Sequence, residues 1–328
     1  MPRVLSLSLR PKTLSGLFGQ EELVASIRQQ MATRQPRAFM LYGPSGTGKT
    51  TLARIMAVSF QCTHMTEWGN PCKECWDAQS TFNIHEINAS EVSGVEELGQ
   101  VAVQARYKPL SGSKRVFILD EMQRATSAAQ NLLLKPFEEP AATTVWIVCT
   151  TEPSKILPTL RRRCTTYQLR GLGFTERERF LDKIAKVIKL EKPLDPLVEQ
   201  VHLSNISSPA MLLQAIEKYA AGASAESAAA SIEGSDTNSL RICKAVTSGD
   251  WKTLRDLLAV ASPDDSRWIR SSVSGWVWGI LKKDQSPKSQ ERAQLSLYDL
   301  SVHAPIDDIY MLHWLRAVLY KICKRYRE

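Results

Sequence analysis

The sequence predicts an α/β fold with a parallel sheet, followed by two regions built only of helices. Up to about residue 170, short apolar runs typical of buried strands alternate with helical patterns, which indicates successive βα units. A glycine-rich loop, residues 43–50, follows the first of these runs. From Phe174 onward, apolar residues recur only at helical spacing, so the second half of the chain is expected to be all-helical.

The loop at residues 43–50 fits the Walker A pattern of phosphate-binding loops. An apolar strand is expected before it at 38–42, and a helix after it from residue 51. Such a loop presents backbone N–H groups to phosphate oxygens, while Lys49 reaches the β- and γ-phosphates and the Thr50 hydroxyl holds Mg²⁺. The residues expected to contact ATP here are Gly43, Pro44, Ser45, Gly46, Thr47, Gly48, Lys49, Thr50 and Thr51.

Two further strands are expected to end at the same nucleotide site. The run 115–119 ends in Asp120 and Glu121, where Asp120 can hold Mg²⁺ and Glu121 can position and polarise an attacking water. An ordinary acidic turn is the alternative, which the phosphate-binding loop upstream disfavours. The run 144–149 ends next to Thr151, which is placed to sense the γ-phosphate or the water because ligands bind at the carboxyl ends of parallel strands.

Length and charge limit the class of protein. A chain of 328 residues favours two or three domains, and no apolar run approaches the roughly 18 residues that span a bilayer. The N-terminus lacks the continuous apolar segment of a secretory signal, so no membrane role is expected. Lys and Arg number 42 against 34 Asp and Glu, and the net charge of +8 favours a polyanionic partner. The charge does not distinguish DNA, RNA and acidic protein surfaces.

A cysteine module is expected at residues 62–78. The odd total of seven cysteines argues against a complete disulfide framework. Cys72 and Cys75 have the spacing of a zinc knuckle, and Cys62 is a third candidate ligand. A structural zinc site needs four ligands, and Ala78 stands where a further cysteine would fall, so the alternative is a module that has lost its metal. The candidate fourth ligands are His64, His85 and Asp77.

The helical half divides at a segment rich in Ala, Ser and Gly, residues 220–238, part of which is expected to be a linker. The last ninety or so residues are rich in tryptophan, and tryptophans at helical spacing indicate helix packing rather than base stacking. The expected domains are therefore 1–170, 171–235 and 236–328. Within the first of them, Pro136 is expected to kink the last turn of the helix that follows the acidic strand end.

Taken in order, these motifs resemble the AAA+ clamp-loader ATPases, above all the bacterial DNA polymerase III gamma/tau subunit, with kinship to replication factor C small subunits. The resemblance covers about the first 220 residues. It rests on the Walker A loop, the cysteine spacing, and four further segments. These are the adenine-site segment that contains Arg10 and Pro11, the helix segment 132–140, the sensor 1 residues 150–153, and the Arg161-Arg162-Arg163-Cys164 run.

The resemblance implies an ATPase motor that uses ATP and Mg²⁺ to place a sliding clamp on primer–template DNA. It implies an AAA+ domain, a helical lid and an all-helical collar, a ring of five subunits, and a cytoplasmic location at the replication fork. Arg163 aligns with the arginine finger, which a neighbouring subunit contributes to the transition state. A basic cluster that contacts DNA phosphates is the other interpretation of this arginine run. Alternative functions are a non-hydrolysing structural subunit of the delta-prime type and a different AAA+ motor.

Two departures from the family pattern bear on catalysis. Arg162 stands where the family has serine, and Ala210 stands where it has the sensor 2 arginine, which implies a weaker contact between the lid and the γ-phosphate. The candidate DNA contacts are Arg124 and the basic turn Lys108–Arg115.

Overall fold

The computed structural model describes residues 5–33, 38–65, 67–78, 83–91, 95–109, 114–230, 237–259, 261, 266–284, 286–302, 305 and 308–327. The chain forms two compact units. The first comprises Met1–Leu172 together with Ser208–Ala210, and the second comprises Gly173–Ser207 and Met211–Glu328. The short segment 208–210 therefore belongs to the α/β unit although it lies far along the chain.

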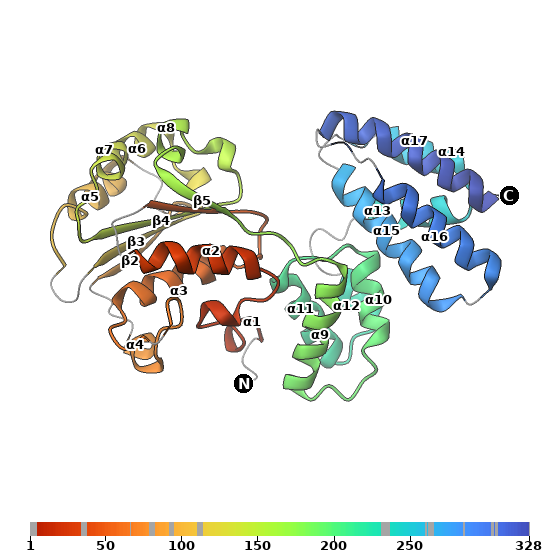
Figure 1. Ribbon diagram of the computed structural model, residues 1–328, viewed down its shortest axis with the longest axis horizontal. Helices are drawn as coiled ribbons and strands as arrows, with labels where there is room; N and C mark the ends of the chain where they lie inside the picture. The colour runs from red at the N-terminus through yellow and green to blue at the C-terminus, as the bar shows by residue number, and fades with distance from the viewer. Residues whose placement is uncertain are drawn as a thin grey trace. The chain divides into compact units, whose positions relative to one another are not determined.

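A five-stranded parallel sheet forms the centre of the first unit, in the order β2-β3-β4-β1-β5 (Figure 1). The three central strands are buried along almost their whole length, which explains why they read as continuous apolar runs in the sequence. The strands are β1 (Ala38–Tyr42), β2 (Ile84–Asn88), β3 (Arg115–Asp120), β4 (Thr144–Thr150) and β5 (Cys164–Gln168). The predicted α/β class with a parallel sheet is confirmed.

Helices cover both faces of this sheet. On one face, the apolar sides of α2 (Glu21–Ala32) and α3 (Lys49–Gln61) pack against β1, β3 and β4. On the other face lie α5 (Val95–Gln104), α6 (Ser127–Leu132), α7 (Leu134–Glu138) and α8 (Pro158–Arg161).

The helix after β3 is divided at Leu133, three residues before Pro136. Proline lacks the N–H that would bond to the carbonyl four residues earlier, and its ring crowds that carbonyl. At the division, the Leu133 N–H donates to the carbonyl of Gln130, three residues earlier, in a tighter turn than that of an α-helix. The expected interruption is present, but it falls ahead of the proline and separates α6 from α7 rather than kinking a last turn.

The remaining elements of the first unit are short. They are α1 (Leu5–Ser8), α4 (Lys73–Ala78) and three 3₁₀ helices, η1 (Leu14–Gly16), η2 (Met122–Arg124) and η3 (Pro153–Lys155).

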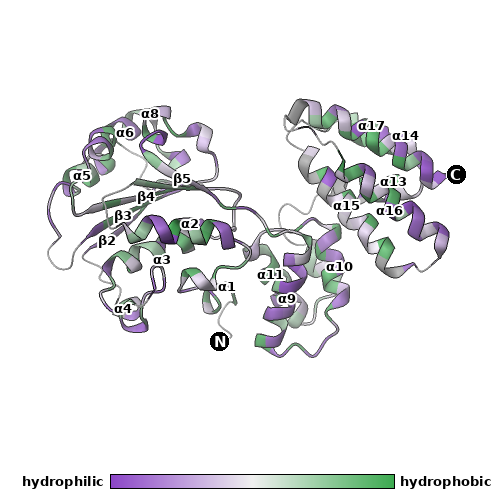
Figure 2. Ribbon diagram, in the orientation of Figure 1, coloured by the Kyte–Doolittle hydropathy of each residue, from purple (hydrophilic) through white to green (hydrophobic). Residues whose placement is uncertain are grey.

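The second unit is all-helical. Figure 2 shows hydrophilic and hydrophobic residues alternating along its helices, as expected where one face of each helix is buried. Trp251 packs edge-on against Tyr320 with ring centroids 4.7 Å apart, and the Trp276 indole N–H donates to the Thr247 hydroxyl at 3.2 Å. Its helices are α9 (Phe174–Ile188), α10 (Asp195–Leu203), α11 (Pro209–Ala220), α12 (Ala225–Ala230), α13 (Thr237–Thr247), α14 (Trp251–Ala259), α15 (Ser266–Lys283), α16 (Pro287–Ser301) and α17 (Asp308–Arg327).

The segment expected to contain a linker, 220–238, includes helix α12. The predicted boundary between residues 235 and 236 falls outside the described residues. Within the part of the chain that the structure describes, no helix is long and apolar enough to cross a membrane.

Candidate nucleotide site

Three loops meet where β1, β4 and β3 end. The register pairs Tyr42 of β1 with Thr150 of β4, and Val148 of β4 with Leu119 of β3, so the ends of these strands lie side by side. The Walker A loop leaves β1, the acidic pair 120–121 leaves β3, and Thr151 leaves β4 between them. Parallel topology therefore gathers residues that are far apart in the sequence at one edge of the sheet.

The Walker A loop requires glycine where its backbone approaches other segments. A Cβ at Gly43 would lie 2.1 Å from the Leu169 carbonyl oxygen. Gly46 has a φ of +73°, and a Cβ there would lie 2.3 Å from the Ser208 hydroxyl oxygen. Both positions combine positive φ with close contact, which only glycine accommodates at little cost. The sequence folds here into a loop with its backbone available to a phosphate.

Lys49 is the first residue of α3 and is buried, with 6% of its surface exposed. Its ammonium group donates to the carbonyl oxygens of Gly43 at 2.9 Å and Pro44 at 2.8 Å. Burial lowers the pKa of Lys49, while the nearby negative groups Asp120 and Glu121 act in the opposite direction. The lysine is thus held inside the curve of the loop, the position expected of a phosphate ligand.

Thr50 and Asp120 form the direct link between the two halves of the site. The Thr50 hydroxyl donates to Asp120 Oδ2 at 2.7 Å, and the Glu121 backbone N–H donates to Asp120 Oδ1 at 3.0 Å. Burial raises the pKa of Asp120, and these two hydrogen bonds only partly offset that effect. A hydroxyl and a carboxylate oxygen held together in this way are the ligands that Mg²⁺ uses in nucleotide sites.

The electrostatics of the site fit a nucleotide with its metal ion. Burial disfavours both the charged ammonium of Lys49 and the charged carboxylate of Asp120. A phosphate anion beside the lysine and a divalent cation beside the aspartate would each stabilise the charged form of its neighbour. The donor set and the glycine loop therefore fit ATP with Mg²⁺.

Glu121 and Thr151 are connected through a residue that the sequence analysis did not single out. Glu121 has left-handed backbone angles, φ 51° and ψ 37°. The Gln123 side-chain amide donates to the Glu121 carboxylate and accepts from the Thr151 backbone N–H at 3.3 Å. In the sequence, the one indication that Gln123 belongs to the site is its position two residues after Glu121.

The other residues expected to contact ATP are placed less directly. The Thr47 hydroxyl donates to the Pro44 carbonyl at 2.9 Å, which stabilises the loop internally. Ser45 is exposed, and Thr51 is half-buried in the first turn of α3. Arg10 and Pro11 follow α1. Burial lowers the pKa of Arg10, and the charge of Arg54 in α3 acts in the same direction. The structure describes no contact that joins it to the loop.

The segment that carries Ala210 packs on the Walker A loop through its backbone. The Ala210 N–H donates to the Gly46 carbonyl at 3.2 Å, and Ser208 faces the same glycine. A methyl side chain cannot donate to a phosphate. The position that the resemblance assigns to the sensor 2 arginine therefore holds a residue that contacts the loop but supplies no charge.

Arg163 lies at the opposite end of the sheet from the Walker A loop. It immediately precedes β5, whose first residue, Cys164, pairs with Ala38 at the start of β1. The Walker A loop begins after Tyr42 at the other end of that strand, about five residues or roughly 16 Å away. The Arg163 guanidinium pairs with Glu138 and donates to the Thr159 carbonyl at 2.6 Å. It cannot serve the nucleotide site of its own chain.

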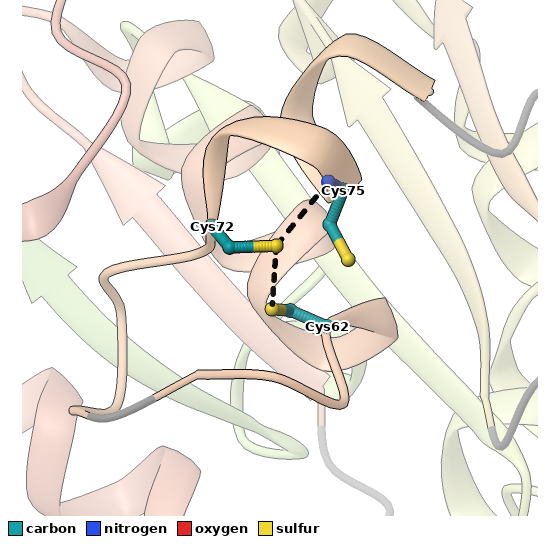
Figure 3. A group of neighbouring side chains, drawn as sticks. All are labelled: Cys62, Cys72 and Cys75. Carbon is teal, nitrogen blue, oxygen red and sulfur yellow. Dashed lines mark hydrogen bonds between the residues drawn. The ribbon is translucent and has the colours of Figure 1, made fainter.

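The three cysteines of the predicted module come together (Figure 3). Cys62 Sγ and Cys72 Sγ are 3.9 Å apart, and the three sulfurs lie within 4.8 Å of one another. Two sulfurs on a tetrahedral zinc ion with 2.3 Å bonds would be about 3.8 Å apart. The Cys75 backbone N–H donates to Cys72 Sγ at 3.4 Å and lowers the pKa of that thiol. The arrangement fits a zinc ion.

The three candidates for a fourth ligand are placed differently. His64 lies with Cys72 and Glu74 in a second group whose ligand atoms are all within 4.8 Å of one another. His85 stacks on Phe117 with ring centroids 5.0 Å apart, and the Asp77 carboxylate pairs with Lys12 at 3.4 Å. Of the three candidates, His64 lies beside one cysteine of the cluster, Cys72.

One predicted DNA contact is wrong. Arg115, at the end of the basic turn, is buried at 8% exposure, and its guanidinium donates to the Gln104 carbonyl at 2.8 Å and the Lys108 carbonyl at 3.3 Å. It stabilises the entry to β3 and is not a surface cation. Residues 110–113 of that turn lie outside the described residues, whereas Arg124 is exposed at the end of η2.

The fold and this site are those of an α/β protein with a phosphate-binding loop. A model of the family described as DNA polymerase III, delta subunit, matches residues 19–173. The DNA polymerase III subunit gamma/tau of Mycobacterium tuberculosis is 33% identical over 224 residues, which covers 65% of this chain and 38% of the relative. The subunit tau of Bacillus subtilis is 31% identical over 169 residues, which covers 50% of this chain and 30% of that protein.

These matches confirm the resemblance to AAA+ clamp-loader subunits that the motifs predict. The chain spans less than two fifths of the length of these two relatives. Among solved structures, the Thermotoga maritima RuvB Holliday junction branch migration motor superimposes with a TM-score of 0.48 at 17% identity, covering 81% of this chain and 85% of that one.

Proposed function

We propose that this chain is an ATPase subunit of a sliding-clamp loader, and that it binds and hydrolyses ATP with Mg²⁺ to place a clamp on primed DNA. The observation that supports this most directly is the Thr50–Asp120 hydrogen bond of 2.7 Å beside the buried Lys49. We assign ATP binding to residues 1–170, a lid to 171–235, and subunit association to a collar at 236–328. Within a complex, the partners are other loader subunits in a ring of five, the clamp and primer–template DNA.

Each residue has a distinct task in this proposal. Lys49 and the backbone N–H groups of the loop bind the phosphates, and bound Mg²⁺, held through Thr50 and Asp120, supplies charge neutralisation. Glu121 orients the attacking water and accepts its proton, while Thr151 contacts the water or the terminal phosphate. Arg163 stabilises the charge that develops at the site of an adjacent subunit. Catalysis by positioning and electrostatics is what phosphoryl transfer requires.

ATP turnover tests the proposal directly. We expect turnover to rise when primed DNA and a sliding clamp are added together, because clamp loading couples hydrolysis to both. DNA alone and clamp alone serve as controls. A branch-migration motor would instead respond to branched DNA without a clamp, and that result would contradict clamp loading.

A non-hydrolysing structural subunit is the second candidate, and Ala210 is the observation that favours it. Without a cation at this position, the lid lacks the usual charge contact with the γ-phosphate. The two candidates differ in one substitution experiment: an assembled complex in which only this chain carries Glu121→Gln should lose turnover under the first proposal and keep it under the second.

Binding to DNA should depend on nucleotide and on salt. A protein that follows the DNA backbone needs cations that face phosphates, and the candidates Arg124 and Lys108 are exposed. With a non-hydrolysable ATP analogue, the assembled complex should prefer a recessed 3′ primer end over blunt duplex. If about six phosphates are neutralised, affinity should fall roughly a thousandfold between about 50 and 200 mM salt. Equal binding with ADP, or indifference to the primer end, would contradict clamp loading.

A zinc ion held by Cys62, Cys72 and Cys75, with His64 as the fourth ligand, is part of the proposal. The 3.9 Å between the sulfurs of Cys62 and Cys72 supports it, as do the third sulfur within 4.8 Å of both and the position of His64 beside Cys72. The ion would stabilise the segment between α3 and β2 by joining Cys62, at the end of α3, to the two cysteines beside α4.

Elemental analysis of protein purified without chelator should give about one zinc per chain. Cys72→Ser combined with Cys75→Ser should release it and lower the thermal stability. His64→Ala should weaken retention against a chelator, whereas His85→Ala is the matched control, because His85 stacks on Phe117 instead. Wild-type protein that carries no zinc would show that the module has lost its metal.

A further inference from the structure

The side chain of Gln123 bridges two loops of the nucleotide site. It is buried at 9% exposure, in η2 between the ends of β3 and β4. Its oxygen accepts hydrogen bonds from the Thr150 hydroxyl at 2.8 Å and from the Thr151 backbone N–H at 3.3 Å. Its nitrogen donates to Oε2 of Glu121. A single amide therefore joins the carboxylate after β3 to the residues at the end of β4.

The orientation of this amide follows from its partners. A backbone N–H can only donate, so the atom of Gln123 that faces Thr151 must be the oxygen. The nitrogen then faces Glu121, whose ionised carboxylate can only accept. A side chain at this position needs a donor and an acceptor on one planar group, and glutamine supplies both. A leucine has neither, and a glutamate would keep the acceptor but lose the donor.

The backbone of Glu121 adds to the constraint. Its left-handed angles are uncommon for a residue with a side chain, because Cβ crowds the neighbouring carbonyl. The adjacent Asp120 carboxylate accepts the Glu121 N–H at 3.0 Å, which fixes the start of the turn. The Glu121 side chain is thus directed by a tight turn at one end and by the Gln123 amide at the other.

We propose that Gln123 is a positioning residue that sets the place of the Glu121 carboxylate and links it to the Thr151 segment. This inference rests on the proposed function, in which Glu121 orients the attacking water. Movement at Thr151 reaches Glu121 through one rigid amide. A change at the terminal phosphate is thereby transmitted to the carboxylate without any contact between Gln123 and the nucleotide.

Two substitutions separate the halves of the bridge. Gln123→Glu retains the acceptor toward Thr150 and Thr151 but removes the donor toward Glu121, and Gln123→Leu removes both. In each variant, kcat for ATP should fall by about tenfold to a hundredfold, the usual effect of misplacing a catalytic group by about 1 Å. The affinity for ATP should stay near the wild-type value, because the hydrogen bonds of Gln123 join it to neither Lys49 nor the Walker A loop.

Gln61→Leu is the matched control. The Gln61 amide donates to the Lys114 carbonyl at 2.6 Å, at the opposite end of β3 from Asp120. This variant loses a side-chain hydrogen bond of similar kind, so it should lower stability while kcat is unchanged. A fall in kcat for Gln61→Leu that equals the fall for Gln123→Leu would overturn the positioning role, because stability alone would then explain both.

A double-mutant cycle with Glu121→Ala completes the test. If Gln123 acts through Glu121, Gln123→Leu should lower kcat little further in the Glu121→Ala background. Fully additive losses would overturn the inference. The same cycle is measured by urea unfolding without nucleotide, where the bridge predicts non-additive changes and additivity would refute it. A wild-type chain without turnover in any assembly contradicts the proposed function, while the unfolding cycle still decides whether the bridge exists.

Discussion

Replacing Lys49 by alanine should abolish ATP turnover and weaken ATP binding by about tenfold to a hundredfold, the range expected for a lost charged hydrogen bond. The lysine is buried inside the loop and donates to its carbonyls, so the alanine variant loses the positive charge that the loop holds. Binding is measured by calorimetry or by a fluorescent ATP analogue, and turnover by phosphate release.

Two other variants make the Lys49 result interpretable. Glu121→Gln should bind ATP almost normally but turn it over about a hundredfold or more slowly, because a neutral amide accepts a proton poorly. Lys186→Ala, which removes an exposed lysine paired with Asp182, should change neither property. Wild-type turnover in the Lys49 variant would remove the Walker A loop from the proposed reaction.

Replacing Arg163 by alanine should leave ATP affinity near normal and lower turnover in the assembled complex by about a thousandfold or more, the usual contribution of an arginine finger. Arg163 lies at the opposite end of the β1–β5 pair from the Walker A loop of its own chain. Its loss should therefore spare ATP binding in its own chain and affect turnover at the site of a neighbouring chain. Arg106→Ala is a control of the same type, since Arg106 is exposed in the same unit.

Mixing experiments test whether the finger acts between chains. A preparation of Arg163→Ala chains and a preparation of Glu121→Gln chains should each be nearly inactive. When they are mixed before assembly, some interfaces combine an intact Glu121 with an intact Arg163, so activity should partly return. A mixture as inactive as its components, or a monomer with full activity, would rule out a finger supplied by a neighbour.

Much of the sheet could be predicted from the sequence because strands buried on both faces are continuous apolar runs. Ala38–Tyr42 matches the predicted strand residue for residue, and the strand that begins at Thr144 ends one residue later than expected. The parallel topology alone also explains why the Walker A loop, Asp120 and Thr151 lie close together at one edge of the sheet. The tasks of these residues, and the domain boundaries at 170 and 235, remain predictions.

Other features depend on long-range contacts that leave no pattern in the sequence. Arg115 looks like part of a basic surface turn, yet its guanidinium bonds to carbonyls that folding brings beside it. Gln123 lies in a short turn without periodicity, so its two partners become visible only in three dimensions. The inclusion of segment 208–210 in the unit of the Walker A loop likewise depends on tertiary packing.

In the proposed function, the separation of Arg163 from the Walker A loop gives each chain two unlike ends, one that offers a finger and one that needs it. Copies or relatives joined in this way associate head to tail, through two different patches rather than one shared patch. An open arc of such chains has one interface fewer than it has chains. The number of nucleotide sites that have both a Walker A loop and a finger is therefore one fewer than the number of chains. At one end of the arc, a chain would bind ATP without a finger to act on it. The rate per chain would then rise with the length of the arc, and ring closure would complete the last site.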